Sequence, residues 1–352
     1  MLSVIIPFGL SLERAFIKER IEWKAKFYKS EKELEFIFVE GFSSVFCPKL
    51  KELIINQGHI YIKDESQNSF SQGKCRNLGA KRARFEALFF LDADCYLSHL
   101  SFQRLLNLIK LKQISQLENA FLMLPCLYLN KEASEILSKK DESLWESLAL
   151  LDLHKDKKEL ILNFALASSL IALNKKAFLS LKGFDESFIG HGYEDFEFVL
   201  RFLKKYVCFE KLPSNLEFDS RNWEFKAFEG FRALFSLLGL EGVFYGLYPL
   251  HFWHENPNQN GYLDNKEKNH ALFYKELKNT KMLLQKNAQK SFIGLNSIVY
   301  KPYLCEQRHF SFLKARLSHT KIYRLFVKFK KDPKGFFKDS KNPFFKFFLK
   351  AK

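Results

Sequence analysis

Residues 87–97 read Ala-Leu-Phe-Phe-Leu-Asp-Ala-Asp-Cys-Tyr-Leu, five apolar residues followed at once by two carboxylates one residue apart. The apolar run predicts a strand that is buried on both faces of a parallel sheet. Asp92 and Asp94 then follow the carboxyl end of that strand, where open α/β sheets bind their ligands. Carboxylate oxygens at this edge favour a divalent cation that also holds substrate phosphates. The alternative is a loop that caps the next helix, which an isolated Asp-x-Asp pair would favour.

Apolar runs upstream of this stretch predict the rest of a doubly wound α/β sheet. We expect strands over 2–8, 34–39 and 59–63, and a first helix over 13–28, in the order strand, helix, strand, strand, helix, strand. Downstream, the same patterns predict two helices and two strands. They lie at 103–111 and 131–137 for the helices and at 121–129 and 165–173 for the strands.

The helix that leads into the buried strand carries Arg76 and Asn77 near its start, flanked by Gly73 and Gly79. A helix start with a guanidinium is suited to bind a diphosphate or the base of a nucleotide. The alternative is a surface helix rich in Lys and Arg, and these residues alone do not decide between the two.

A second acidic pair, Glu194 and Asp195, follows a loop that contains Gly183, Gly190 and Gly192. We expect both carboxylates in the first turn of a helix, after a loop whose glycines allow close approach to a ligand. A carboxylate in such a position is suited to act as a base that takes the proton of an attacking hydroxyl. An acidic helix start without chemistry is the alternative for an isolated Glu-Asp pair.

Two histidines, His251 and His254, lie beside Trp253 after an apolar segment. An imidazole nitrogen from one of them would supply a further ligand to the metal expected at the first acid pair. A lone histidine is more often structural, and the sequence does not settle which of the two would bind the ion.

These motifs, in this order, resemble the inverting family-2 glycosyltransferases with the GT-A fold. The resemblance rests on Ser3-Val-Ile-Ile-Pro7, Val39-Glu40, Arg76-Asn77-x-Gly79 and Phe90-Leu-Asp-Ala-Asp94. It implies a Rossmann-like mixed sheet flanked by helices, in which Glu40 contacts the nucleoside, Arg76 and Asn77 contact the nucleotide, and Asp94 ligates Mn²⁺ or Mg²⁺. The nucleotide-sugar-binding residues expected on this basis are Pro7, Glu40, Arg76, Asn77, Asp92 and Asp94.

The second acidic region resembles the acceptor-side motif of β-1,4-galactosyltransferases and chondroitin-type polymerases. The matching residues are Gly183-Phe-Asp-Glu186 and Gly190-His-Gly-Tyr-Glu-Asp195. The resemblance implies that Asp195 is the catalytic base and that Glu194 holds the acceptor. His191 departs from the Trp-Gly pair of many relatives, which leaves the acceptor sugar open. In related hexosaminyltransferases the first histidine of a similar element binds the metal, which favours His251 over His254.

The positive charge of the chain is concentrated at its carboxyl end. The 352 residues are 47% hydrophobic and 27% charged, which is typical of a folded, soluble protein. Of the net charge of +16, residues 311–352 carry +11, from thirteen Lys or Arg and two acids. We expect a catalytic domain over 1–300 and a helical, basic, Phe-rich extension over 301–352 that binds an anionic membrane surface. Nucleic acid is the rival partner, but the rest of the chain is only mildly basic, so we expect none.

Three further features bear on the compartment. The six cysteines include no Cys-x-x-Cys pair, which favours reduced thiols in a cytoplasm. The N-terminal residues lack the basic and long apolar regions of a signal peptide, so we expect a strand there. Residues 234–253 are apolar but interrupted by glycines, a proline and a charge, and we expect them to pack without spanning a membrane. We therefore expect a cytoplasmic protein, peripheral on the inner face of the cell membrane.

The function expected from these features is metal-dependent, inverting glycosyl transfer. A hexose or N-acetylhexosamine would move from a UDP-sugar to a glycan or lipid-linked glycan, in bacterial surface polysaccharide (capsule) or lipooligosaccharide synthesis. The alternative, from another functional class, is a non-catalytic subunit of the same fold that scaffolds a glycan-assembly complex. Both acidic pairs are intact in the sequence, which favours the enzyme.

Overall fold

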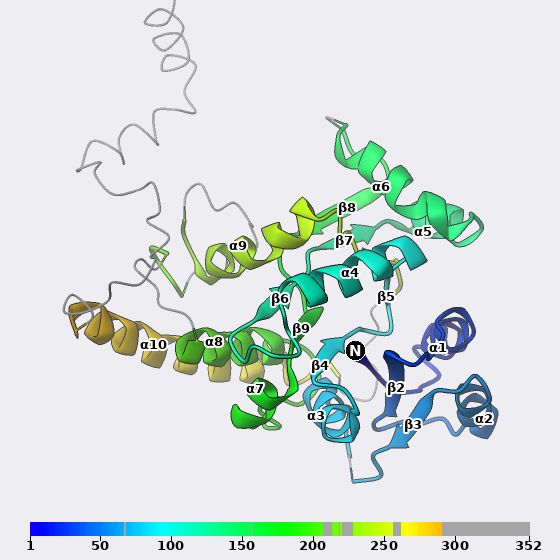
Figure 1. The fold of residues 1–352 in the computed structure, drawn as a ribbon, viewed down its shortest axis with the longest axis horizontal. Helices are drawn as coiled ribbons and strands as arrows, with labels where there is room; N and C mark the ends of the chain where they lie inside the picture. The colour runs from blue at the N-terminus through cyan, green and yellow to red at the C-terminus, as the bar shows by residue number, and fades with distance from the viewer. Residues whose placement is uncertain are drawn as a thin grey trace, which may run out of the picture. The chain divides into compact units, whose positions relative to one another are not determined.

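The computed structural model describes residues 1–66, 68–155, 157–206, 213–217, 219, 228–255 and 262–290, with the backbone alone for 280–290. These residues belong to one compact unit, Met1–Lys290 (Figure 1). The domain boundary expected at residue 300 and the basic extension over 301–352 lie outside the described residues.

The larger of the two sheets in the described chain has six strands in the order β3-β2-β1-β4-β9-β6. They are β3 (Ile60–Lys63), β2 (Leu34–Glu40), β1 (Leu2–Phe8), β4 (Ala87–Phe90), β9 (Ile171–Asn174) and β6 (Phe121–Met123). The first four are parallel, whereas β9 is antiparallel to both neighbours. Ile5 pairs with both Ile37 and Phe90, so β1, β2 and β4 end at the same edge. The predicted mixed sheet is confirmed.

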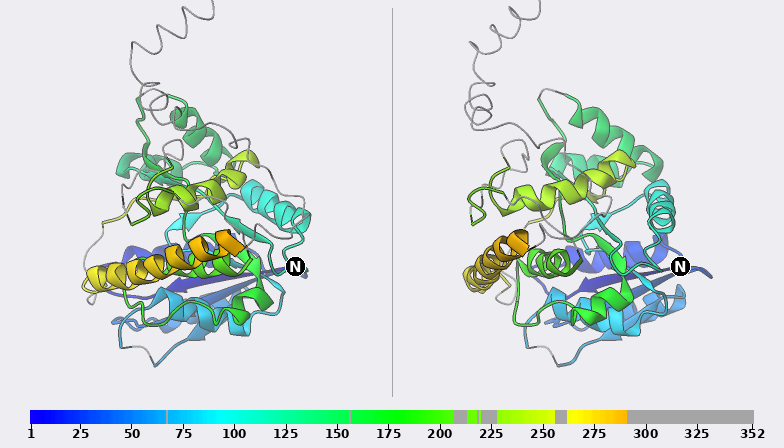
Figure 2. Two further views of the ribbon diagram at one scale, coloured as in Figure 1. Left: turned by 90° about the vertical axis from the view of Figure 1, so that its left-hand side faces the viewer. Right: turned by 60° about the vertical axis from the view of Figure 1, so that its left-hand side comes forward.

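Helices cover both faces of this sheet (Figures 1 and 2). Side chains alternate along β1. Val4 and Ile6 therefore join the core beneath α1 (Phe16–Phe27), α2 (Pro48–Asn56) and α4 (His99–Leu111). Ile5 joins the core on the other face, which includes residues of α3 (Gln72–Arg82), α7 (Lys175–Ser180) and α8 (Glu194–Tyr206). On that face α10 (Lys266–Lys290) packs along α8 (Figure 2).

The strands expected over 34–39 and 59–63 are present as β2 and β3. Their direct succession is wrong, because α2 lies between them. Parallel neighbouring strands require a crossover connection, which is usually a helix. Pro48 occupies the first turn, where its missing N–H costs nothing, and Leu50 and Ile54 fill the core. The helix has only nine residues, so its periodic signal is short.

A second, smaller sheet has the order β5-β10-β7-β8 and was not expected. Its strands are β5 (Cys95–Tyr96), β10 (Leu250–His251), β7 (Cys126–Leu129) and β8 (Ile161–Ala165). The single strands expected over 121–129 and 165–173 are wrong, because each stretch is divided between the two sheets. Pro125, which lacks an N–H group, separates β6 from β7. The pairing of His251 with Cys95 brings β10 beside the acid pair.

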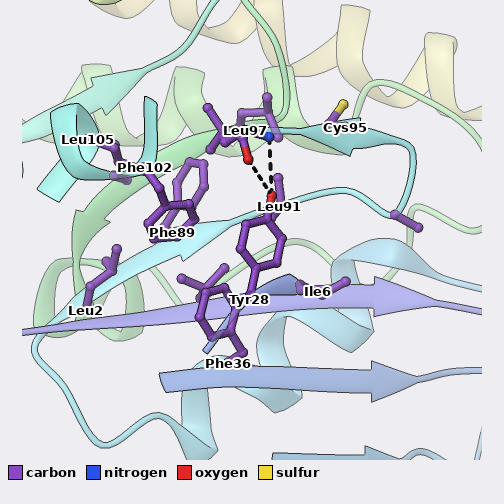
Figure 3. Close-up of a cluster of buried hydrophobic side chains, with 14 of the residues drawn as sticks. Leu2, Ile6, Tyr28, Phe36, Phe89, Leu91, Cys95, Leu97, Phe102 and Leu105 are labelled. Carbon is purple, nitrogen blue, oxygen red and sulfur yellow. Dashed lines mark hydrogen bonds between the residues drawn. The ribbon is translucent and has the colours of Figure 1, made fainter. Parts of the chain in front are cut away.

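Tyr28 forms two hydrogen bonds with the backbone of Leu97, in the segment that follows the acid pair (Figure 3). Its buried hydroxyl donates to the Leu97 carbonyl at 3.1 Å and accepts from the Leu97 N–H at 3.2 Å. The ring stacks on Phe36 and lies against Phe102. Leaving such buried backbone groups without partners would cost about 1–3 kcal/mol, so these bonds hold the chain in place just after Asp94.

The apolar segment 234–253 packs within the fold, as α9 (Phe231–Phe244), a turn and β10. Phe235 is fully buried. A Cβ added at Gly239 would lie 1.3 Å from the Leu166 carbonyl oxygen, so α9 approaches the backbone of Leu166 as closely as only glycine allows. Within the described residues, no helix is long and apolar enough to cross a membrane.

Candidate active site

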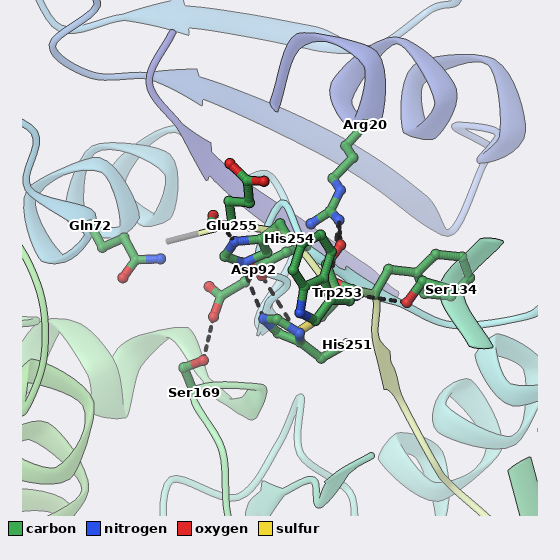
Figure 4. A network of polar contacts seen from close by, with 12 residues as sticks. Arg20, Gln72, Asp92, Ser134, Ser169, His251, Trp253, His254 and Glu255 are labelled. Atoms are coloured by element: carbon green, nitrogen blue, oxygen red, sulfur yellow. Dashed lines mark hydrogen bonds and ion pairs between the residues drawn. The ribbon is translucent and has the colours of Figure 1, made fainter. Parts of the chain in front are cut away.

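Asp92 and Asp94 follow β4 at the edge where the parallel strands end, as predicted. Asp92 is buried, and protein groups occupy both of its oxygens. Oδ1 accepts a hydrogen bond from Arg76 Nη2 at 2.6 Å. Oδ2 accepts one from the Ser169 hydroxyl (Figure 4). The side chain of Asp92 is therefore fixed by the protein, which leaves Asp94 as the acid that faces the histidines.

Arg76, on α3, is completely buried and joins the two acidic pairs. Its Nη2 contacts Asp92 at 2.6 Å and its Nη1 contacts Glu194 Oε1 at 3.1 Å. The guanidinium lies over the Phe184 ring at 5.1 Å. Burial opposes its charge, but Asp92 and Glu194 outweigh burial and raise the pKa of Arg76 above its usual value. A buried ion triad thus connects the end of β4 to the start of α8.

Glu194 and Asp195 begin α8 and line a cavity of about 600 Å³. Burial and the neighbouring Asp195 raise the pKa of Glu194 to about 7, against the opposing charge of Arg76. Its Oε2 atom is buried and has no hydrogen-bond partner among the described residues. Burial also raises the pKa of Asp195. Carboxylates whose pKa lies nearer neutrality, in a cavity, are suited to accept a proton from a hydroxyl.

The loop before α8 holds these acids in position through unusual backbone angles. Gly190, Gly192 and Tyr193 have φ values of 74°, 96° and 73°. A Cβ at Gly190 would lie 2.4 Å from the Tyr262 carbonyl oxygen, so glycine is required there. Tyr193 is a non-glycine residue in the left-handed region, and its ring stacks on Phe273 of α10. Strain of this kind persists where the surrounding structure imposes it, and here it precedes the acidic pair directly.

Asp94, His251 and His254 bring three potential ligand atoms within 4.8 Å of one another. The Oδ2 atom of Asp94 lies 3.4 Å from His251 Nε2 and 3.1 Å from His254 Nε2. Two ligand atoms at right angles, each about 2.1 Å from a Mg²⁺-sized ion, would be separated by about 3.0 Å. Burial opposes ionisation of Asp94, but the two histidines outweigh it and hold the pKa of Asp94 well below its usual value.

The hydrogen bonding of His254 tests whether this trio suits a metal. Its Nδ1 lies 2.7 Å from the Glu255 carbonyl oxygen, which can only accept, so Nδ1 carries the proton. The Nε2 atom of the same ring lies 3.1 Å from Oδ2 of Asp94. A backbone carbonyl on the other ring nitrogen is the usual support of a metal-binding histidine. The residues therefore fit a divalent cation.

Aromatic rings and backbone contacts hold the two histidines. His251 stacks on Tyr128 at 4.4 Å, and His254 stacks on Phe16 at 4.6 Å. Between them, Arg20 donates to the carbonyls of Phe252 at 3.1 Å and Trp253 at 2.8 Å. Both imidazoles face Asp94, so the geometry does not choose between His251 and His254.

The chain matches the family model for Glycosyltransferase like family 2 over residues 3–279. The chain belongs to this family. Its mixed sheet, flanked by helices and ending in the acid pair, is the GT-A fold. No match is found among curated protein sequences.

Among solved structures, the glycosyltransferase is similar to S. aureus TarS 1–349 in complex with UDP. The identity is 19%, the TM-score is 0.38, and the match covers 58% of this chain and 54% of that one. It is also similar to GalNAc-T7 with UDP, GalNAc and Mn²⁺, with 18% identity, a TM-score of 0.38, and coverage of 58% and 40%. A third match is glucosyl-3-phosphoglycerate synthase from Mycobacterium tuberculosis, with Mn²⁺, UDP and phosphoglyceric acid, with 16% identity, a TM-score of 0.34, and coverage of 59% and 65%. The glycosyltransferase thus spans less than two thirds of each of these chains.

The other residues predicted for the nucleotide-sugar site of this glycosyltransferase lie apart from the large cavity. Pro7 lines a smaller cavity that shares Asp94 with the large one. Glu40 ends β2, accepts from the Tyr61 hydroxyl at 2.6 Å and is buried. Asn77 bonds the backbone of Phe184 twice, through Nδ2 at 2.9 Å and Oδ1 at 2.8 Å. Arg76 and Asn77 therefore have protein partners, and their contact with a nucleotide stays a prediction.

The structure brings together Asp92, Asp94, Glu194, Asp195, His251 and His254 around the large cavity. Sequence analysis missed several residues that share this wall or support it. They are Arg14, Gln72, Tyr128, Ser169, Arg232, Tyr262 and Lys266. None of these belongs to a short motif, because each meets the site through the fold.

Removing the charge of Arg76 tests the buried triad. Arg76→Met leaves Asp92 and Glu194 without their shared counter-charge, so we expect the free energy of unfolding in urea to fall by about 3–5 kcal/mol. The control is Arg84→Met, which breaks an ion pair between Arg84 and Glu35. The Arg84 side chain is 61% exposed, so this substitution should lower the free energy of unfolding by less than about 1 kcal/mol. Equal, small losses for the two variants would contradict a structural role for Arg76.

Proposed function

We propose that this glycosyltransferase transfers a hexose or N-acetylhexosamine from a UDP-sugar to a glycan acceptor, with inversion and with a divalent cation. One observation carries the proposal: a single cavity has Asp94 with two histidines on its wall, and also Glu194 and Asp195. Glycosyl transfer needs both a site for the diphosphate leaving group and a base for the acceptor, and these two groups of residues supply them.

Asp195 takes the proton in this reaction. The acceptor oxygen forms a bond to the anomeric carbon, the bond from that carbon to the diphosphate breaks, and the acceptor proton passes to the Asp195 carboxylate. Glu194 is held by Arg76 through Oε1, so its unpartnered Oε2 is available to a hydroxyl of the acceptor. Attack from the side opposite the leaving group inverts the anomeric centre. A Mn²⁺ or Mg²⁺ ion held by Asp94, His251 and His254 would offset the charge of the diphosphate.

The acceptor and location that we propose rest on the sequence alone. A glycan or lipid-linked glycan in capsule or lipooligosaccharide synthesis suits an enzyme whose basic, Phe-rich residues 301–352 bind the inner face of the cell membrane. A non-catalytic scaffolding subunit is the competing proposal. Turnover of any UDP-sugar by the purified protein would exclude it.

Asp195→Asn separates binding from chemistry. The amide is nearly isosteric with the carboxylate but accepts no proton, so we expect donor binding to persist while transfer falls by a factor on the order of 10² to 10⁴. A radiolabelled UDP-sugar assay with Mn²⁺ measures the rate, and calorimetry with UDP measures binding. Near-normal transfer would show that the base lies elsewhere, with Glu194 the next residue to test.

Asp94→Ala addresses the metal. Because Asp94 is the acid that both histidines face, we expect its loss to abolish the Mn²⁺ dependence of UDP binding and to leave the fold intact. Thermal shift with UDP, with and without Mn²⁺, measures this, since a ligand that binds only the folded state raises the midpoint. Asp141→Ala, at an acid outside the cavity, is the control. Unchanged Mn²⁺-dependent binding by Asp94→Ala would remove the metal role from Asp94.

Truncation after Leu304 tests the membrane proposal. Each Lys or Arg near an anionic surface contributes about 1 kcal/mol, so the shortened chain should no longer sediment with anionic vesicles at physiological salt. Its turnover of a soluble acceptor should stay close to that of the full chain. Persistent sedimentation would refute the extension as the anchor, and lost turnover would show that it packs on the catalytic domain.

A further inference from the structure

Arg14 is a buried cation for which the mechanism above gives no role. It lies in the turn between β1 and α1 and is 8% exposed. Its guanidinium lies 5.2 Å from the Phe16 ring centre and 5.4 Å from that of Tyr262. Within the described chain, no carboxylate or carbonyl accepts a hydrogen bond from this guanidinium, and its Nε is buried without a partner. A buried cation in this state is costly unless an anion joins it.

The position of Arg14 indicates which anion that is. The large cavity and the smaller one at the end of β1 share four lining residues, which are Arg14, Gln72, Asp94 and Tyr262. Arg14 and the metal-facing acid Asp94 therefore line the same junction. The large cavity also contains Asp195, the acid that takes the acceptor proton. A group bound at the junction lies beside the reacting centre on one side and the end of β1 on the other.

We propose that Arg14 binds the diphosphate of the sugar-nucleotide donor at this junction. The inference rests on the proposed function and names a residue that its donor site requires. Arg76, the arginine that sequence reasoning assigns to the nucleotide, uses Nη1 for Glu194 and Nη2 for Asp92. Two carboxylates thus already neutralise the charge of Arg76, whereas Arg14 has no carboxylate partner among the described residues. The donor fork of arginine matches phosphate oxygens, and the two rings that flank Arg14 hold it without using its N–H groups.

Arg14 acts on the leaving group by charge alone. As the bond from the anomeric carbon to the diphosphate breaks, its electron pair passes to the phosphate oxygen and negative charge accumulates there. Arg14 stabilises this charge and transfers no proton, because a guanidinium stays protonated.

The test compares ligands with and without phosphate. UDP, inorganic pyrophosphate and uridine are titrated with Mn²⁺ against the wild-type chain, Arg14→Gln and Arg14→Lys. We expect Arg14→Gln to weaken UDP and pyrophosphate about 10- to 100-fold and to leave uridine unchanged. Arg14→Lys should give a smaller loss with the same selectivity. Arg84→Gln removes an exposed arginine outside both cavities and should change nothing.

The outcomes separate this inference from the proposed function. If Arg14→Gln binds UDP as tightly as the wild type, or weakens uridine as much as UDP, the assignment of Arg14 is overturned even where sugar transfer is observed. If Arg14→Gln does not fold, the selectivity of Arg14→Lys decides in the same way. If UDP binding depends on Arg14 but no UDP-sugar is turned over, the proposed function fails and the inference stands. A wild-type chain that binds neither UDP nor pyrophosphate would overturn both.

Discussion

The arrangement of this site depends on one buried guanidinium, that of Arg76, which holds Asp92 at the end of β4 and Glu194 at the start of α8. Taking three charged groups out of water costs free energy that their attraction only partly returns, so the value of the triad is positional. Close packing of α3 places Arg76: a Cβ on Gly79 would lie 2.5 Å from Ile5 of β1. Packing of one helix on the sheet thereby sets the separation between the two acidic pairs.

Apolar runs in the sequence predicted strands correctly where the whole run belongs to a single sheet. The apolar runs that became β1, β2 and β4 were recognised because each stays in a single buried sheet along its length. Residues 121–129 and 165–173 are equally apolar, but each stretch passes from one sheet to the other. A run of apolar residues looks the same in the sequence whether it is buried in one sheet or in two. Local hydrophobicity reports that a residue is inside, and does not report which partner strand it meets.

The contrast between local pattern and long-range contact also explains which site residues could be predicted from the sequence. Acids and histidines were recognised from motifs of a few residues, and the fold brings Asp94, His251 and His254 together. Ser169 and Arg14 carry no such signal. Ser169 meets Asp92 across 77 positions of the chain, and Arg14 is distinguished by its burial and missing partner, which only coordinates show. Sequence analysis assigned Arg76 to the nucleotide, and its spacing does not reveal that its partners in the fold are two carboxylates of the protein.

The acidic residues on the cavity wall bear on whether the proposed diphosphate donor would bind together with a cation. The proposed diphosphate would enter a space whose wall carries Asp94, Glu194 and Asp195, all of which would repel it if ionised. Burial raises the pKa of Glu194 and Asp195, so this pair holds less than its full negative charge near neutral pH. Asp94 has the opposite tendency, because its two histidines keep it ionised. The remaining repulsion is therefore concentrated at the one acid that also has the ligand set for a cation, so the proposed diphosphate and cation would bind most favourably together.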